Sequence, residues 1–179
     1  MSDIDEHGRP EPPLASDEVA TLRGFLDYQR ATFEWKCTGL DAPTLRTSVG
    51  ASTMTLGGMM KHLAVVEEGW FWEQLWARPA GPPWNAVDWE DDRDWEWRTS
   101  LDDSPEQLWA QWRKSVDIAN SALDEALRGG GLDQLALKQW RDGRSPSLRW
   151  IMCHMIEEYA RHNGHADLIR EAIDGQTGE

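Results

Sequence analysis

The sequence is poor in the features that mark nucleic-acid-binding and membrane proteins. Only 18 of its 179 residues are Lys or Arg, against 32 Asp or Glu. The resulting formal net charge of −14 opposes binding to a polyanion such as DNA, RNA or an anionic membrane surface. No apolar run approaches the ~20 residues that a membrane-spanning helix needs. We therefore expect neither a nucleic acid nor a membrane as a partner.

The chain also lacks the marks of an exported protein. Its first residues, MSDIDEHGRPEPP, do not contain the basic and then apolar segments of a signal peptide. The two cysteines, Cys37 and Cys153, form neither a CxxC pair nor a disulfide framework. Both fall within helical patterns, so we expect both to be reduced and buried. These absences together predict a cytoplasmic protein.

No useful stretch of alternating apolar and polar residues, the pattern typical of β-strands, occurs in the sequence. Apolar residues instead recur at three- and four-residue steps in four segments, and each segment predicts a helix of roughly twenty residues or more. The four segments are residues 17–39, 56–77, 105–128 and 148–173. Four helices with one apolar stripe each predict an all-α fold, a four-helix bundle that occupies residues 16–179.

The ends of the predicted helices carry recognisable signals. Ser104 is followed by Pro105 and, three residues after the serine, by Gln107, which predicts a capping box with proline in the first turn. Gly129 then ends that segment. Residues 1–15 lack periodicity and contain three prolines, so we expect a flexible N-terminal arm or one that is draped over the bundle.

Tryptophan is abundant, with twelve residues against three phenylalanines and two tyrosines. Its large apolar surface and single N–H donor suit a pocket with a polar mouth as well as a core. Four tryptophans, at positions 84, 89, 95 and 97, fall in residues 78–103, which we call the tryptophan-rich loop. A connection this long between the second and third helices is more often functional, for example a lid, than a plain connector.

Candidate metal ligands lie in the last helical segment, within HMIEEYARHNGH at residues 154–165. Glu158 and His162 are four residues apart, so in a helix they point the same way, one turn apart. His154 lies one turn further back, and the three positions span about 80° of the helix surface at ~100° per residue. Neutral imidazoles with a carboxylate bind divalent metals such as zinc, nickel or iron.

His62, in the predicted helix over residues 56–77, also falls on an apolar face, in the stripe that contains Met59 and Val66. It is a further candidate ligand, because a helix bundle gathers ligands from separate helices into its core. A structural alternative stays open at this point. The pattern E-x-x-x-H is common on helices, and a core histidine is more often a hydrogen-bonded structural residue than a ligand.

Three segments of the chain resemble the DinB-like metalloenzyme superfamily. They are LRGFLDYQRATFEWKCTGLD, LGGMMKHLAVVEEGWFWEQLW and HMIEEYARHNGHADLIREAIDG, and the likeness extends from about residue 17 to about residue 175. The family commonly ends in H-x-x-x-H followed by R-G-Q, whereas this chain has Glu158-x-x-x-His162 followed by Asn163-Gly164-His165. Glutamate at the first position resembles the actinobacterial branch, which contains mycothiol-dependent S-transferases and the metal-binding domain of mycothiol-dependent maleylpyruvate isomerase.

The resemblance implies a ligand set and a reaction class. His62, Glu158 and His162 would hold a divalent metal, which is Zn, Ni or Fe. Four further residues would line the pocket or contact the metal-binding side chains: His154, Trp70, Met59 and Val66. The metal would activate the sulfur of a low-molecular-weight thiol such as mycothiol for transfer to an electrophilic substrate, in a detoxification role. Because the chain ends soon after the last helix, S-transfer is expected rather than isomerisation.

The resemblance also makes a homodimer an expectation, since DinB-like proteins are often dimers. It does not remove the competing interpretation. A non-catalytic, dimeric helical-bundle protein, which serves binding or interaction and keeps a structural or vestigial metal site, would carry the same residues. Metal content distinguishes the two interpretations.

Overall fold

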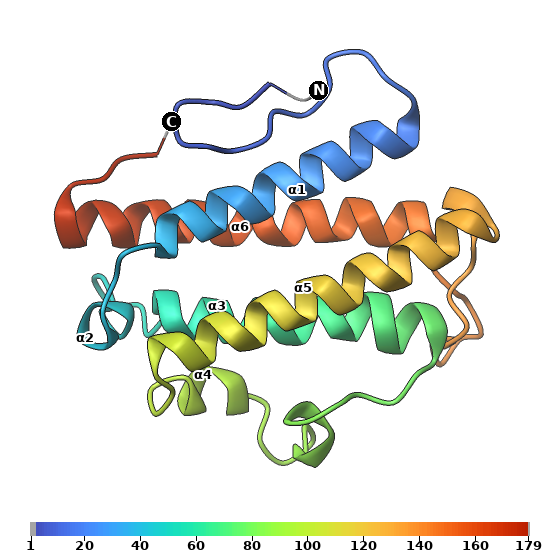
Figure 1. The fold of residues 1–179 in the computed structure, drawn as a ribbon. Helices are drawn as coiled ribbons and strands as arrows, with labels where there is room; N and C mark the ends of the chain where they lie inside the picture. The colour runs from blue at the N-terminus through green and yellow to red at the C-terminus, as the bar shows by residue number, and fades with distance from the viewer. Residues whose placement is uncertain (1–2, 179) are drawn as a thin grey trace. The chain divides into compact units, whose positions relative to one another are not determined.

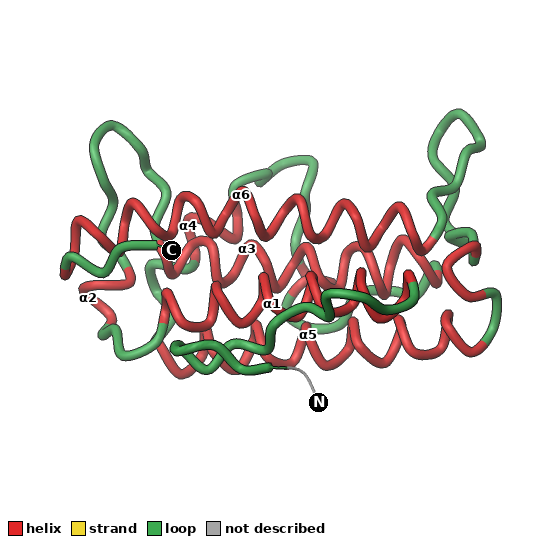
Figure 2. Tube along the Cα trace, turned by 90° about the horizontal axis from the view of Figure 1, so that it is seen from above, coloured by secondary structure: helices red, strands yellow, loops and turns green. Residues whose placement is uncertain are grey.

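A computed structural model describes residues 3–178, and the chain forms two compact units. Unit 1 comprises Met1–Leu56 and Met152–Glu179, and unit 2 is the continuous segment Gly57–Ile151. No β-strand forms among residues 3–178, where two isolated bridges, Ile4–Pro10 and Leu135–Ser147, are the β contacts found (Figure 2). The prediction of an all-α fold is confirmed.

Four long helices occur where the sequence predicted them (Figure 1). They are α1 (Glu18–Cys37), α3 (Leu56–Glu68), α5 (Pro105–Arg128) and α6 (Leu148–Asp174). Two short helices, α2 (Ala42–Leu45) and α4 (Trp95–Thr99), were not predicted. The second predicted helix differs in one respect: instead of a regular helix over residues 56–77, α3 passes into a π-helix at Gly69–Gln74.

The helix ends form as the cap residues dictate. In α5 the side chain of Ser104 accepts from the Gln107 amide at 3.3 Å, and the Gln107 side chain accepts from the Ser104 amide at 2.8 Å. This reciprocal pair is the predicted capping box. In α1, the Asp17 side chain accepts from the Ala20 amide at 2.8 Å and so satisfies one of the donors that a helix start leaves unpaired.

Unit 1 is built on α1 and on α6 from Met152 onward, two helices that run in the same direction (Figure 1). Asn163 donates to the Gln29 carbonyl at 2.9 Å, and Arg170 donates to the Lys36 carbonyl at 2.8 Å. Both contacts span the same sequence separation of 134 residues, which is the pattern of a parallel pair. The first and last long helices of the chain are therefore direct neighbours.

Unit 2 is built on α3, the π-helix that follows it, and α5, and this pair is also parallel. Ser115 donates to Glu68 at 2.7 Å and Trp76 donates to the Ala122 carbonyl at 3.1 Å, at sequence separations of 47 and 46 residues. A parallel pair needs a connection that returns along the whole length of the helices. Residues 78–103, the tryptophan-rich loop, make that return, which explains the length of the loop.

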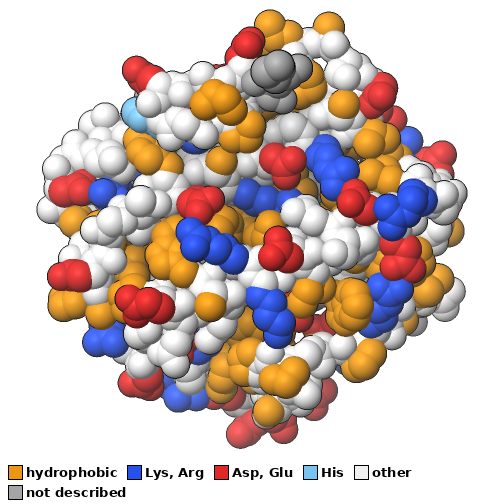
Figure 3. All heavy atoms as spheres, in the orientation of Figure 1, with side chains coloured by type: hydrophobic (Ala, Val, Ile, Leu, Met, Phe, Trp, Pro, Cys, Tyr) orange, Lys and Arg blue, Asp and Glu red, His pale blue; other side chains and the backbone are white. Residues whose placement is uncertain are grey.

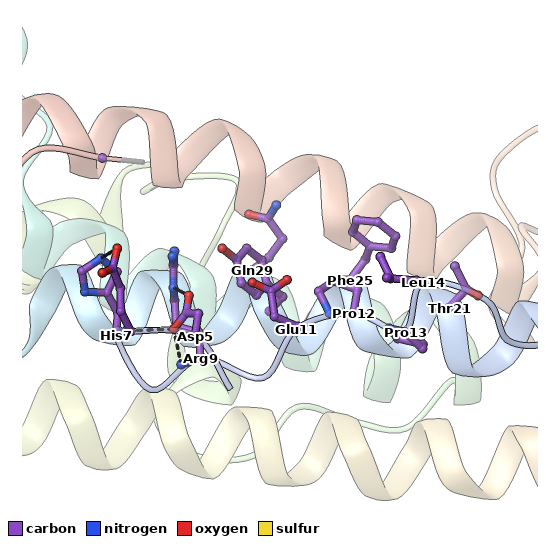
Figure 4. A pocket seen from close by; sticks show the side chains of 13 residues that line it. Asp5, His7, Arg9, Glu11, Pro12, Pro13, Leu14, Thr21, Phe25 and Gln29 are labelled. Atoms are coloured by element: carbon purple, nitrogen blue, oxygen red, sulfur yellow. Dashed lines mark hydrogen bonds and ion pairs between the residues drawn. The ribbon is translucent and has the colours of Figure 1, made fainter. Parts of the chain in front are cut away.

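The N-terminal arm lies against α1 in unit 1 (Figure 4). Arg9 is buried; its guanidinium donates to Asp5 at 2.7 Å and to Thr32 at 3.1 Å. The ring of His7 stacks on Trp35 with centroids 4.0 Å apart. A cavity of about 890 Å³ lies between the arm and α1. These contacts show how residues 3–14 are draped over the helix.

Close approach of the arm to α1 depends on Gly24. A Cβ atom at this position would lie 2.6 Å from Cδ of Pro13 and 3.2 Å from Cα of Pro12. We expect Gly24→Ala to displace the arm and to accelerate hydrogen exchange over residues 3–14, although alanine itself favours α1 by about 1 kcal/mol. Mass spectrometry of exchanged peptides measures this effect.

Gly164→Ala is the matched control for Gly24→Ala, because Gly164 is also helical and the methyl group that alanine adds there would meet no atom within 4 Å. This variant should leave exchange in the arm unchanged. If the arm of the unaltered protein already exchanges as fast as an unstructured peptide, the docked arrangement is wrong.

The surface carries both signs of charge despite the net charge of −14. On the face in Figure 3, acidic and basic side chains are interspersed with apolar ones. The described atoms of that face therefore present no broad field of one sign, of the kind that steers polyanions. Among residues 3–178, no helix combines the length and the apolar character that crossing a bilayer requires.

Candidate functional site

Glu158 and His162 lie on α6 in unit 1, at the predicted spacing of one helical turn. His162 belongs to the buried stripe of this helix, between Tyr159 and Ala166, and is 4% exposed. Glu158 lies at the border of this stripe, and its Oε1 atom is 3.5 Å from Nε2 of His162. Two donors bound to one ion at ~2.0–2.2 Å lie about 3–3.5 Å apart, so this pair has the separation of two ligands of one metal.

Packing against α1 fixes the direction in which this pair points. Asn163 is buried, and its amide donates to both the carbonyl and Oε1 of Gln29, at 2.9 and 2.7 Å. Because Asn163 directly follows His162, these two bonds hold the rotation of α6 about its axis at the position of the ligand pair. The His165 ring, one turn further along, lies 5.7 Å from the His162 ring. Sequence reasoning had not assigned Asn163 this role.

His154 has a carboxylate contact of its own. Its Nδ1 lies 3.4 Å from Oε2 of Glu157, a half-exposed residue that also accepts from Arg161 at 2.7 Å. The structure thus places His154 in a chain of polar side chains on α6. Its assignment to the pocket stays a prediction.

His62 lies on α3 in unit 2, and two contacts fix its ring. Nδ1 lies 3.1 Å from Oε1 of Glu96, and the ring stacks on Trp97 with centroids 4.8 Å apart and an interplanar angle of 25°. Both partners belong to α4, inside the tryptophan-rich loop. In a neutral ring, a carboxylate acceptor at Nδ1 favours the tautomer with the proton on Nδ1 and the lone pair on Nε2.

The tryptophan-rich loop is anchored to α3 at both of its ends. Near its start, buried Trp84 donates from Nε1 to Oε1 of Glu68 at 3.0 Å. Near its end, Lys61 forms an ion pair with Asp103 at 2.6 Å, and the same ammonium lies 4.5 Å from the ring centroid of Trp95. Lys61 directly precedes His62, so the loop is tied to the helix at the position of the candidate ligand.

The predicted pocket residues of unit 2 lie on α3 and on the π-helix that follows it. Met59 is fully buried, whereas Val66 is half-buried. Trp70 is the second residue of the π-helix, and its ring lies 5.4 Å from that of Trp150. π-Helices often occur at functional sites, because they turn side chains away from the direction that a regular helix would give them. Burial raises the pKa of Glu73, in the same π-helix.

The two cysteines behave differently. Cys37 is fully buried, as predicted, and burial raises the pKa of its thiol well above the usual value. The prediction that Cys153 is buried is wrong, because Cys153 is exposed. It follows Met152, which faces the core, and one residue turns the side chain by about 100° around the helix.

Glu96 is the residue of this region that sequence reasoning missed. It lies in a loop that the sequence predicted to be irregular, and 34 positions of the chain separate it from His62, its contact partner. The run Trp95-Glu96-Trp97, a single acid between two large aromatic residues, was the signal that could have indicated a buried carboxylate.

Comparison with known proteins places this geometry in context. A family model described as Mycothiol-S-transferase matches residues 21–175. Among solved structures, a conserved protein of a locus from Enterococcus faecalis has a similar fold, with a TM-score of 0.65 and 16% identity, over 90% of this chain and 100% of that one. The comparison with curated proteins gave no match.

The structural similarity, at this low identity, bears on the fold alone. The family match bears on descent, because it covers most of the chain and includes both helices that carry the candidate ligands. The resemblance noted in the sequence is thereby confirmed, and the chain belongs to the mycothiol S-transferase family.

Proposed function

We propose that the protein is a divalent-metal-dependent S-transferase that transfers a low-molecular-weight thiol of the mycothiol class to an electrophilic substrate. The observation that carries the proposal is the family match, which spans His62, Glu158 and His162. These three residues are the proposed metal ligands, each offering one ligand atom.

The donor set fits such an ion. Two imidazole nitrogens and a carboxylate oxygen suit zinc, nickel or iron, and three protein ligands leave positions open for a substrate. The separation of 3.5 Å between Glu158 and His162 matches two ligands of one metal. In His62, the hydrogen bond at Nδ1 leaves Nε2 as the nitrogen that would bind the metal.

A bound divalent ion would lower the pKa of a coordinated thiol, so that thiolate is present at neutral pH. The chain itself contributes the geometry. The carboxylate of Glu158 would balance part of the charge of the ion, and the buried position of His162 would limit water around it. The tryptophan-rich loop, with Trp70, Met59, Val66 and His154, would form the walls of the substrate pocket.

The cysteines of the protein take no part in this proposal. Cys37 is fully buried with a raised thiol pKa, which disfavours the thiolate that a nucleophile needs. Cys153 is exposed, and burial does not disfavour it. The proposal assigns the reacting sulfur to the small thiol. A divalent metal that is zinc, nickel or iron, a homodimer, a cytoplasmic location and a role in detoxification stay predictions that accompany this function.

The test begins with the metal. The purified protein should contain about one equivalent of a divalent metal per proposed site. After this metal is removed, zinc at ~100 times its dissociation constant should stabilise the fold by about 2.7 kcal/mol, a rise in Tm of ~5–11 °C. Thiol transfer to a generic electrophile is then assayed with mycothiol and with glutathione, with and without a chelator. We expect transfer with mycothiol that the chelator abolishes.

A different outcome would support the competing interpretation. If no stoichiometric metal is found, and neither zinc nor nickel shifts the melting temperature, the protein is a non-catalytic helical binding or interaction module. Metal binding without thiol transfer would instead indicate a structural or vestigial site.

A further inference from the structure

Glu96 is a buried carboxylate whose position needs an explanation. Its side chain is 7% exposed, and Oε1 lies 3.1 Å from Nδ1 of His62. Oε2 is also buried and has no hydrogen-bond partner among the residues that the structure describes. Buried polar atoms are nearly always paired, so an incompletely paired carboxylate indicates a purpose other than stability.

A carboxylate opposite Nδ1 has a defined effect on a histidine. It holds the proton on Nδ1, directs the lone pair to Nε2 and makes that nitrogen a better metal ligand. A neutral acceptor would be a cheaper partner for a histidine whose role was only structural, because burying a charge costs more than burying an amide.

We infer that Glu96 is the positioning residue of His62, which fixes the Nδ1–H tautomer and the direction of Nε2 towards the metal. The inference rests on the proposed function, in which His62 is a ligand. Glu96 would not touch the metal or the substrate. It would act through the imidazole, from a helix in the tryptophan-rich loop.

Trp97 supplies the second constraint on the same ring. The hydrogen bond from Nδ1 sets the rotation of the imidazole in its own plane, and the stack on Trp97 at 4.8 Å sets the plane itself. Glu96 and Trp97 are adjacent in α4, so one short helix holds both contacts. Lys61, one residue before His62, forms an ion pair with Asp103, which follows this helix in the chain. Its ammonium lies 4.5 Å from the ring centroid of Trp95, the first residue of α4.

The experiment measures zinc affinity by competition with a chelator in the full-length protein. Glu96→Ala should weaken zinc binding ~10–100-fold, the loss typical of removing a partner that orients a metal-bound histidine. Glu96→Gln should lose less, because its side-chain carbonyl can still accept from Nδ1. Glu90→Ala and Glu90→Gln are matched controls, since they change an exposed carboxylate of the same loop that lies outside α4, and both should stay within ~3-fold of the unaltered protein.

A second readout does not depend on the metal. In the metal-free protein, nitrogen NMR of the imidazole should show His62 protonated at Nδ1 at a pH where the ring is neutral. Glu96→Ala should shift the proton towards Nε2, whereas Glu96→Gln and the Glu90 variants should preserve the Nδ1–H form.

The outcomes separate this inference from the proposed function. Unchanged zinc affinity in Glu96→Ala, or an equal loss in the Glu90 variants, overturns the positioning role while the metal site stands. If the unaltered protein binds no zinc, the proposed function fails, and the tautomer measurement alone decides whether Glu96 sets the state of His62. An unchanged tautomer in Glu96→Ala overturns the inference in either case.

Discussion

Replacing His162 by alanine is expected to weaken zinc binding by more than the ~100-fold that loss of an outer partner costs, and to abolish thiol transfer. The reason is that His162 is proposed as a direct ligand and lies in the buried stripe of α6, where alanine supplies no donor atom. Alanine is the best helix former, so α6 itself should persist. Metal retained after dialysis, and zinc affinity by chelator competition, measure the effect.

The His162 experiment is interpreted against two other histidines. His62→Ala should cause a comparable loss, because the two are proposed to serve one ion. His154→Ala should cause a much smaller one, since His154 has its own contact with Glu157. Circular dichroism should show that helical content is largely kept in all three variants. Equal losses of zinc affinity in all three would mean that the ligand set is wrong.

Trp84→Ala is expected to have the largest effect on stability, a decrease of about 3–5 kcal/mol in the free energy of unfolding. Trp84 is 3% exposed, and its indole donates to Glu68, a carboxylate that is itself 2% exposed. The truncation leaves a large cavity and removes one of the two donors to Glu68 that the structure shows, the other being Ser115. Thermal unfolding should show a lower Tm by ~6–20 °C.

Two variants define what Trp84 contributes. Trp84→Phe keeps most of the packed surface but loses the donor, so it should lie between the unaltered protein and Trp84→Ala. Trp140→Ala removes a half-buried tryptophan that makes an edge contact with Trp150, and it should cost less than Trp84→Ala. A loss in Trp84→Ala no greater than in Trp140→Ala would show that Trp84 does not anchor the loop.

Most of the helical architecture could be predicted because its signals are local. The apolar spacing located four long helices, and the Ser104–Gln107 capping box gave the start of α5 to the residue. The change to a π-helix at Gly69 could not be predicted, since it alters the backbone bonding without interrupting the apolar pattern. The parallel direction of α3 and α5 could not be predicted either. Apolar periodicity shows where a helix lies in the sequence but not its direction relative to another helix.

The candidate ligands divide in the same way. A helix fixes the geometry of Glu158 and His162 by itself, so their spacing sufficed to pair them. The partner of His62 comes from tertiary packing of a loop, and no local rule points from position 62 to position 96. Cys153 shows the converse error: its position inside an apolar pattern predicts burial, although the side chain lies on the outer side of the helix.

In the sequence, unit 2 is inserted between the two segments of unit 1, and this order has a consequence for synthesis on the ribosome. Domains fold as units while the chain emerges from its N-terminus, so unit 2, a continuous segment, can complete its contacts while α6 is still being made. Helix α1 can pack against α6 only after α6 has been made, because their contact between Lys36 and Arg170 spans 134 residues of the chain. During that interval the apolar stripe of α1, which contains Leu26, Phe33 and Cys37, is exposed to water and to chaperones. The nascent arm leaves this stripe uncovered, because it packs beside Gly24, on the opposite side of the helix at ~100° per residue.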